Sequence, residues 1–339
     1  MNSENKGIVL KDTNNFTYEK INWIDLDTIP DDYCVIETKA AGFGPYDVGF
    51  ITGRLRINDP KRNFNLGLEG SGVVIKLGNN CDSSLLGKRV AFLADYHNPL
   101  SILSFAKFSV VDRNSLIILP EKIDFAQGAY ILANPLTAKG LFIEVISKSK
   151  SKSIIQDTSS SSLGKMITKI CLKNGIKIIN IVRKEENIKL LEEIGSTFNL
   201  NSSDKNFLQN LEKFVQEINP DVYITYQGGN FPSRVFDKMP FDSKMVSCGN
   251  INNENLHGFS TTDFIFKGKS IEGFQILNYI KEISEEEKKK MYDEVLKSVE
   301  EGEPEYLTQI YKEYALEDFE KAYESYKVNS SLGKIVLKP

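Results

Sequence analysis

Residues 152–184 read KSIIQDTSSSSLGKMITKICLKNGIKIINIVRK, and this stretch decides the fold. Residues 153–155 end a short apolar run. Apolar residues at helical spacing follow from Leu163 to Cys171, and then an almost continuous β-branched run at 176–182. A helix with one apolar face between two strands buried on both faces is the pattern of a βαβ unit. We therefore predict two parallel strands joined by a helix.

The turn between the first strand and the helix, residues 157–164, departs from the usual phosphate-binding pattern. In a dinucleotide-binding fold this turn is rich in glycine, so that backbone N–H groups and the helix N-terminus can hold a pyrophosphate. Here it reads DTSSSSLG, with Gly164 as its single glycine. Serine hydroxyls can bind phosphate oxygens and Asp157 can cap the helix, but a carboxylate within about 5 Å of a phosphate would weaken binding by roughly 1–3 kcal/mol.

Composition restricts the class of protein. The 339 residues are 41% hydrophobic and 26% charged, which suits a soluble protein with room for two domains. The net charge of -4 argues against binding to nucleic acid, because phosphate neutralisation needs a basic surface. Two histidines and four scattered cysteines without a CxxC pair predict no zinc site.

No apolar run reaches the length of a membrane span, and the first residues, MNSENKGIVLK, have neither a signal-peptide core nor the composition of a transit peptide. These features predict a cytoplasmic protein that has no membrane partner.

The pattern of predicted secondary structure changes near residue 120. Before it, β-branched runs at 33–41, 67–78 and 87–94 are bounded by glycine or turn residues, a pattern typical of a barrel or sandwich. From residue 124 an apolar helical stripe begins, and Asn134-Pro135 is expected to interrupt it. Strands and helices then alternate to about residue 248, which predicts a doubly wound parallel sheet.

Short motifs along the whole chain occur in a recognisable order. They are GLEGSGVV at 67–74, GKRV at 87–90, NPLTA at 134–138, LG at 163–164, GG at 228–229 and GKIVL at 333–337. In this order they resemble the medium-chain dehydrogenase/reductase superfamily, specifically its zinc-free branch of quinone-oxidoreductase-like and enoyl-reductase-like proteins.

The resemblance implies an α/β fold made of a GroES-like β-barrel domain and a Rossmann domain. We expect the GroES-like domain at 1–125, the Rossmann domain at 126–270, and a C-terminal return at 271–339 that completes the first domain. It further implies NADP(H) as cofactor and a homodimer formed through Rossmann edge strands, for which a strand at 264–266, followed by residues 267–274, is the candidate.

On the substrate side, the resemblance places the positions of two zinc ligands at Gly44 and Leu68, neither of which can bind a metal. The zinc-free branch has an asparagine in place of Gly44. Tyr46 is the nearest remaining phenol and is the candidate catalytic residue, since it can donate a proton or a hydrogen bond to a carbonyl oxygen. The alternative is a tyrosine that only packs in the turn after Pro45.

On the cofactor side, Arg183 and Lys184 follow the second Rossmann strand, where a basic group pairs with the 2′-phosphate of NADP. The alternative is that both are solvated charges. The remaining candidate cofactor residues match family positions near the nicotinamide or the phosphates, although the glycines also suit tight turns alone. They are Thr137, Ser161, Ser162, Leu163, Gly164, Gly228 and Gly249.

Two functions from different classes follow. The first is an NADPH-dependent, zinc-independent oxidoreductase that reduces a quinone or an activated C=C bond of an enone or enoyl substrate. The second is a degenerate member of the same fold that serves as a structural or interaction subunit of a larger assembly. The second is favoured by departures at Gly44 and Asp157, at Leu55, where relatives often have a tyrosine, and at Thr225, where they usually have an aspartate. Tyr226 and Gln227 are expected to intrude where a cofactor would bind.

Overall fold

The computed structural model describes residues 4–22, 24–56, 64–329 and 332–339. The chain forms two compact units. The β-rich unit consists of Met1–Asn134, Val299–Gly302 and Leu307–Pro339, and the α/β unit consists of Pro135–Ser298 and Glu303–Tyr306. Among the described residues, no helix combines the length and the apolarity that a membrane crossing requires.

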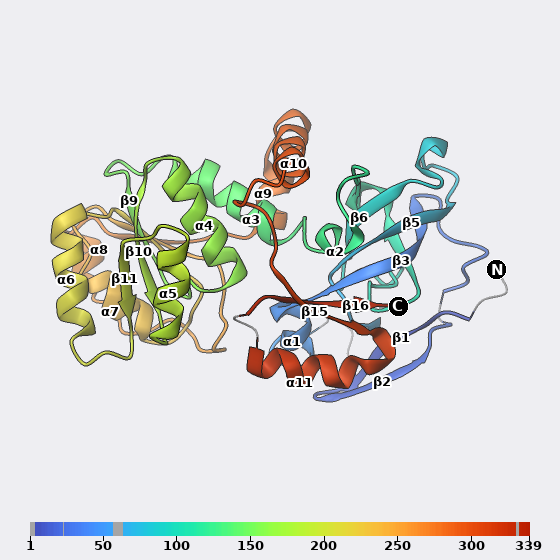
Figure 1. Ribbon diagram of the computed structural model, residues 1–339, viewed down its shortest axis with the longest axis horizontal. Helices are drawn as coiled ribbons and strands as arrows, with labels where there is room; N and C mark the ends of the chain where they lie inside the picture. The colour runs from blue at the N-terminus through green and yellow to red at the C-terminus, as the bar shows by residue number, and fades with distance from the viewer. Residues whose placement is uncertain (1–3, 23, 57–63, 330–331) are drawn as a thin grey trace. The chain divides into compact units, whose positions relative to one another are not determined.

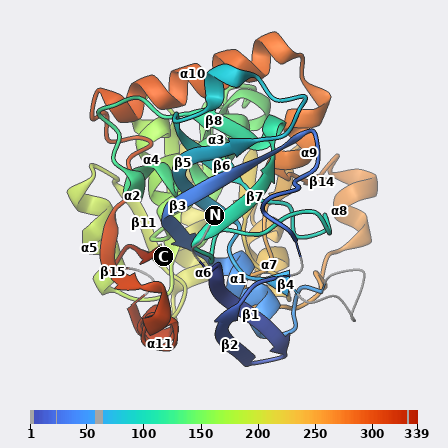
Figure 2. The same ribbon diagram turned by 90° about the vertical axis from the view of Figure 1, so that its right-hand side faces the viewer.

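Two sheets build the β-rich unit. The smaller has the order β2-β1-β4, and the larger runs β15-β16-β3-β5-β6-β8 with β7 paired to β3. Figures 1 and 2 show β1 and β2 as a hairpin at the edge of this unit. The strands are β1 (Lys6–Asp12), β2 (Asn15–Lys20), β3 (Tyr33–Phe43), β4 (Phe64–Asn65), β5 (Glu69–Leu77), β6 (Arg89–Leu93), β7 (Phe108–Asp112), β8 (Leu116–Ile118), β15 (Ile310–Ala315) and β16 (Lys334–Lys338).

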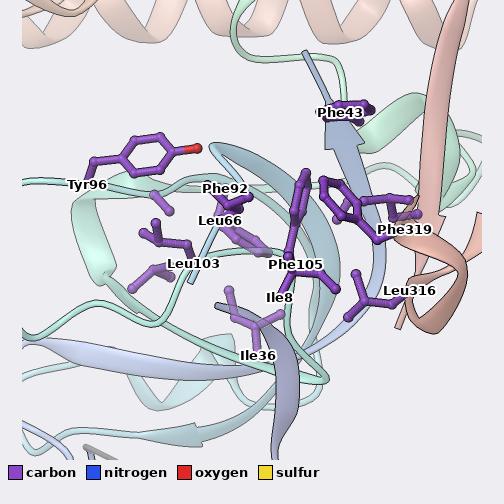
Figure 3. Packing of buried hydrophobic residues seen from close by; sticks show 14 of the residues in the cluster. Ile8, Ile36, Phe43, Leu66, Phe92, Tyr96, Leu103, Phe105, Leu316 and Phe319 are labelled. Carbon is purple, nitrogen blue, oxygen red and sulfur yellow. The ribbon is translucent and has the colours of Figure 1, made fainter. Parts of the chain in front are cut away.

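Residues from both ends of the chain share the core of the β-rich unit (Figure 3). Strand β16 pairs antiparallel with β3, so that Ile335 lies opposite Phe43. The ring of Phe319 lies 5.3 Å from that of Phe43 and 5.4 Å from that of Phe105, measured between centroids. Aromatic rings at such distances add to the free energy gained by burying their apolar surface. The end of the chain is therefore an integral part of this unit.

The α/β unit is a six-stranded sheet whose neighbours are all parallel, in the order β11-β10-β9-β12-β13-β14. The order reverses between β9 and β12, which makes their carboxyl ends the topological switch point where such sheets bind ligands. The predicted doubly wound sheet is confirmed. Its strands are β9 (Ser153–Gln156), β10 (Lys177–Val182), β11 (Phe198–Asn201), β12 (Val222–Thr225), β13 (Lys244–Ser247) and β14 (Ser270–Gly273).

Helices cover both faces of this sheet (Figure 1). Ile154 and Ile178 face a core shared with α3 and α4, whereas their neighbours Ile155 and Ile179 face a core shared with α6 and α7. This alternation is the period of two that a strand imposes. The helices are α1 (Pro45–Ile51), α2 (Phe125–Gly128), α3 (Asn134–Leu141), α4 (Ser162–Lys173), α5 (Glu186–Glu193), α6 (Phe207–Ile218), α7 (Phe231–Asp237), α8 (Thr261–Phe266), α9 (Ile276–Glu282), α10 (Glu285–Glu300) and α11 (Phe319–Asn329).

The predicted interruption of the apolar helical stripe is confirmed: α2 ends at Gly128, and Asn134-Pro135 opens a new helix, α3, because a proline in the first turn has no N–H that would need an acceptor. Another local prediction was wrong. Residues 264–266 are not a strand but the end of α8, and the edge strand is β14, inside the stretch 267–274. A short run of apolar residues does not by itself distinguish helix from strand.

Candidate active site

The serine-rich turn ends in the first turn of α4, next to the carboxyl end of β9. Ser161 caps the helix, since its hydroxyl accepts a hydrogen bond of 3.0 Å from the N–H of Gly164. A Cβ on Gly164 would lie 2.7 Å from the Cα of Ser159, so only glycine fits beside that backbone. Ser162 and Leu163 begin the helix and are partly exposed. The turn thus leaves the N–H groups of Ser162 and Leu163, at the start of α4, available to a ligand.

The carboxylate of Asp157 is buried beneath this turn. Its Oδ2 accepts hydrogen bonds from the Tyr223 hydroxyl at 2.6 Å and the Thr225 hydroxyl at 2.5 Å. Its Oδ1 accepts from the Tyr226 N–H at 3.1 Å and from the Thr158 hydroxyl at 3.0 Å. Burial raises the pKa of Asp157, and these four donors oppose the rise. The carboxylate therefore ties the end of β9 to the end of β12.

Ser159 plays a similar structural part. It is fully buried, donates to the carbonyl of Gln156 at 3.1 Å and accepts from the N–H of Ile181 at 3.0 Å, so it joins β9 to β10. The expectation that Asp157 caps the helix was wrong, because its oxygens are engaged inside the unit and Ser161 is the cap. The turn departs from a glycine-rich pattern mainly because its side chains hold strand ends together.

Arg183 and Lys184 follow β10 at the same edge of the sheet, and both are exposed. Lys184 pairs with Glu186 at 3.3 Å. Within the described part of the chain, the guanidinium of Arg183 has no hydrogen bond or ion pair. Arginine binds phosphate through two parallel N–H groups, so this side chain is free to take a phosphate ligand.

The other candidate cofactor residues lie on separate elements. Thr137 is partly buried in α3. A Cβ on Gly228 would lie 1.8 Å from the carbonyl oxygen of Glu254, and one on Gly249 would lie 3.3 Å from that of Tyr226. Close approach of the chain to itself is thus sufficient to explain glycine at 228, whatever else the position does.

Tyr226 was expected to intrude where a cofactor would bind, but its side chain is directed into the core. Its side chain is 5% exposed and packs in the core between the sheet and α4. Its N–H bonds Asp157, which fixes the backbone, and its ring covers apolar neighbours. Gln227, the next residue, is partly exposed.

In the β-rich unit, Asp47 in the first turn of α1 holds two turns together. Its Oδ2 accepts from the N–H of Gly44 at 3.0 Å, and its Oδ1 accepts from the N–H of Gly67 at 3.1 Å and from the Tyr96 hydroxyl at 2.5 Å. Burial raises the pKa of Asp47 to about 6, although these donors favour the charged form. Tyr46, beside it, is 45% exposed, and its phenol has no hydrogen bond to a described residue.

A second buried acid, Glu69, lies at the start of β5. It accepts a 2.8 Å hydrogen bond from the N–H of Ala133. Burial raises the pKa of Glu69 to about 7, and the charge of Lys334 opposes the rise while that of Asp47 adds to it. Two acids and one lysine thus share a poorly solvated region of the unit.

Lys334, the first residue of β16, interacts electrostatically with both acids. Its ammonium lies 5.4 Å from the centroid of the Tyr130 ring. A Cβ on Gly44 would lie 3.9 Å from the Lys334 Nζ. Burial lowers the pKa of Lys334, and the two acids oppose this. Sequence reasoning missed all three charged residues, because only the fold brings positions 47, 69 and 334 together.

No group of three or more His, Cys, Asp or Glu side chains with metal-binding geometry occurs in the described ranges. Gly44 and Leu68 stand at the two positions where the resemblance places zinc ligands, and neither side chain has an atom that can bind a metal. The residues present therefore do not fit a zinc ion at this place.

Two family models match the chain. Residues 30–121 match the alcohol dehydrogenase GroES-like domain, and residues 162–297 match the zinc-binding dehydrogenase family. A mitochondrial enoyl-acyl-carrier-protein reductase of Arabidopsis thaliana is 25% identical over 329 residues, which cover 94% of this chain and 82% of the relative.

Solved structures agree in fold. A protein of Mesorhizobium loti, provisionally classed as an NADPH:quinone reductase, superposes with a TM-score of 0.89 at 23% identity, covering 100% of this chain and 99% of that one. The quinone oxidoreductase of Escherichia coli in complex with NADPH gives a TM-score of 0.82 at 18% identity, covering 98% and 100%. At these identities the structures establish the fold alone.

Proposed function

The chain belongs to the quinone-oxidoreductase-like branch of the medium-chain dehydrogenase/reductase superfamily, and from this membership we propose that it is an NADPH-dependent, zinc-independent oxidoreductase. Its substrate is a quinone or an activated C=C bond conjugated to a carbonyl. The enoyl-acyl-carrier-protein reductase and the quinone oxidoreductase among its relatives support this substrate class.

The observation that carries the proposal is the arrangement at the carboxyl edge of the parallel sheet. The capped N-terminus of α4 follows β9, and the unpaired guanidinium of Arg183 follows the adjacent β10. Helix N–H groups attract a pyrophosphate, and an arginine after the second strand suits a 2′-phosphate. Bound NADPH supplies the hydride. The N–H groups of Ser162 and Leu163, the hydroxyl of Ser161 and the guanidinium of Arg183 would hold its phosphates, with Gly164 and Lys184 beside them.

Buried Asp157 does not contradict this assignment. Four donors from the protein already engage its two oxygens, so the carboxylate does not need to turn toward a ligand. Burial also raises its pKa, which favours the neutral form that does not repel a phosphate.

Loss of catalysis with retention of the fold is the second candidate. It is favoured by Tyr46, whose phenol is exposed and has no hydrogen bond that would orient it toward a substrate, within the ranges described. Such a protein would act as a structural or interaction subunit of a larger assembly.

For either function we propose a homodimer formed at the edge of the α/β sheet. Strand β14 is the last strand of the sheet, and the adjacent α8 exposes Phe266 by 75% and Ile265 by 65%. An open strand edge beside large exposed apolar side chains is a surface that proteins normally cover.

The test is oxidation of NADPH, followed at 340 nm, by the purified chain with 1,4-naphthoquinone or with an α,β-unsaturated ketone. We expect turnover with NADPH to exceed turnover with NADH, and Arg183→Ala to raise the KM for NADPH at least tenfold without changing that for NADH. If neither substrate class is turned over, the second candidate function, a structural or interaction subunit without catalysis, would remain.

A further inference from the structure

Two cysteine side chains meet in the β-rich unit, away from the residues discussed so far. The thiol of Cys34, in β3, donates to the sulfur of Cys81 at an Sγ–Sγ distance of 3.6 Å. Cys34 is fully buried in the core of this unit, whereas Cys81, in the turn after β5, is partly exposed. The two positions are 47 residues apart in the chain, so only the fold brings these thiols together.

The backbone around the two thiols is held in place. The N–H of Gly78 donates to the carbonyl of Tyr33 at 2.8 Å. The N–H of Asn80 donates to the carbonyl of Asp31 at 2.9 Å. A Cβ on Gly78 would lie 2.4 Å from the carbonyl oxygen of Asp31, so the two segments are in direct backbone contact. A disulfide needs two backbones that lie close together and two side chains that point at one another, and both conditions are met here.

The two thiols differ in what can reach them. Burial raises the pKa of Cys34, and the contact with Cys81 adds to the rise. Because the thiolate is the reactive form of cysteine, buried Cys34 is a poor target for an external oxidant. The sulfur of Cys81 has only a weak hydrogen bond to the carbonyl of Tyr33, at 3.4 Å, and part of its side chain is open to solvent. Cys81 is therefore the thiol that an oxidant reaches first, and Cys34 is the second thiol beside it.

We propose that Cys34 and Cys81 are a redox modification site, at which a small oxidised disulfide of the glutathione class converts the two thiols into a reversible disulfide bond. Disulfides in cytosolic proteins are usually transient and report on redox conditions, which fits a bond that forms only on oxidation. This site does not depend on the proposed reductase function.

The exchange takes place in two balanced steps. The thiolate of Cys81 attacks one sulfur of oxidised glutathione and forms a mixed disulfide, while one glutathione leaves as a thiolate and takes up a proton. Cys34 then loses its proton to solvent and attacks the sulfur of Cys81, which breaks the bond to the second glutathione. Two protein thiols are thus oxidised to one disulfide, and one glutathione disulfide is reduced to two thiols.

The bond would close a covalent loop that contains helix α1 and the candidate residue Tyr46. A cross-link stabilises a fold mainly by restricting the unfolded chain, and the effect grows with the length of the closed loop, here 47 positions. We expect oxidation to raise the melting temperature of the full chain by several degrees, and an excess of dithiothreitol to reverse the rise.

Peptide mapping by mass spectrometry of the full chain, incubated with oxidised glutathione, tests the proposal. We expect the protein to lose the mass of two hydrogen atoms, and the peptides that contain Cys34 and Cys81 to be linked to each other. The double variant Cys171→Ala, Cys248→Ala is the matched control, because it removes the other two cysteines and should react like the wild type. A wild-type protein that shows no link, or a link to Cys171 or Cys248 instead, would overturn the proposal.

Two single variants separate the steps of the exchange. In Cys34→Ala the second thiol is missing, so Cys81 should keep glutathione as a stable adduct, whereas in Cys81→Ala residue Cys34 should stay unmodified. The rise in melting temperature with oxidised glutathione should be absent in Cys81→Ala. An equal rise in the wild type and in Cys81→Ala would contradict the proposal. The peptide map of the wild type decides the question even if Cys34→Ala, a change in the core, does not fold.

Discussion

The hydroxyl of Tyr96 donates a buried 2.5 Å hydrogen bond to the carboxylate of Asp47, and through it joins the segment between β6 and β7 to the first turn of α1. Tyr96→Phe should lower the free energy of unfolding by about 1–3 kcal/mol, because a buried charge loses a donor. Urea denaturation measures this. Tyr18→Phe is the control, since Tyr18 is 43% exposed, and an equal effect of both changes would refute the importance of the bond.

Glu69 should make stability depend on pH. Its pKa is about 7 in the folded chain, above the ordinary 4.5, so the folded state holds its proton more tightly than the unfolded state. Stability from this group is therefore present at low pH and is lost as the pH rises from about 4.5 through 7, by roughly 3 kcal/mol in total. Glu69→Gln removes this loss. We expect the free energy of unfolding of the variant, relative to that of the wild type, to be higher at pH 8 than at pH 5, as measured by urea denaturation. The same difference at both pH values would contradict the prediction.

Gly164 is predicted to matter for both stability and cofactor binding. In Gly164→Ala the new methyl group would lie 2.7 Å from the Ser159 backbone, which has to shift and would displace the first turn of α4. We expect the melting temperature to fall and the Kd for NADPH to rise at least tenfold. Gly273→Ala is the control, because a Cβ there meets nothing within 4 Å. An unchanged Kd for NADPH in Gly164→Ala would show that this turn does not bind the cofactor.

The proposed dimer depends on α8. Phe266→Asp places a charge on a side chain that is 75% exposed in the single chain, so it should not unfold the protein but should prevent burial against a second copy. Sedimentation velocity should then show a monomer in place of the wild-type dimer. Val328→Asp, at a residue 78% exposed on α11, should leave the dimer intact. A dimeric Phe266→Asp protein would rule out this surface.

The sequence predicted the fold well because periodicity is local information. The apolar spacing from Leu163 to Cys171 and the run at 176–182 correspond closely to α4 and β10. Short segments such as 264–266 were misassigned, since three apolar residues fit either a helix or a strand.

The site was less accessible to sequence reasoning. Asp47, Glu69 and Lys334 are far apart in the chain, and no pattern in the sequence shows that they act on one another. The departure at Asp157 was visible, but its reason was not: the partners Tyr223 and Thr225 lie on a strand more than sixty residues later. Contacts of this kind are created by tertiary structure alone.

The most direct test of the account is the melting temperature of the chain with 1 mM NADPH or NADH. A ligand at 100 times its Kd adds about 2.7 kcal/mol to stability, which corresponds to several degrees for a chain of this size. We expect NADPH to raise the melting temperature by several degrees and NADH by much less, with the NADPH shift lost in Arg183→Ala and kept in the control Lys189→Ala. No shift with either nucleotide would contradict the proposal that the chain is an NADPH-dependent reductase.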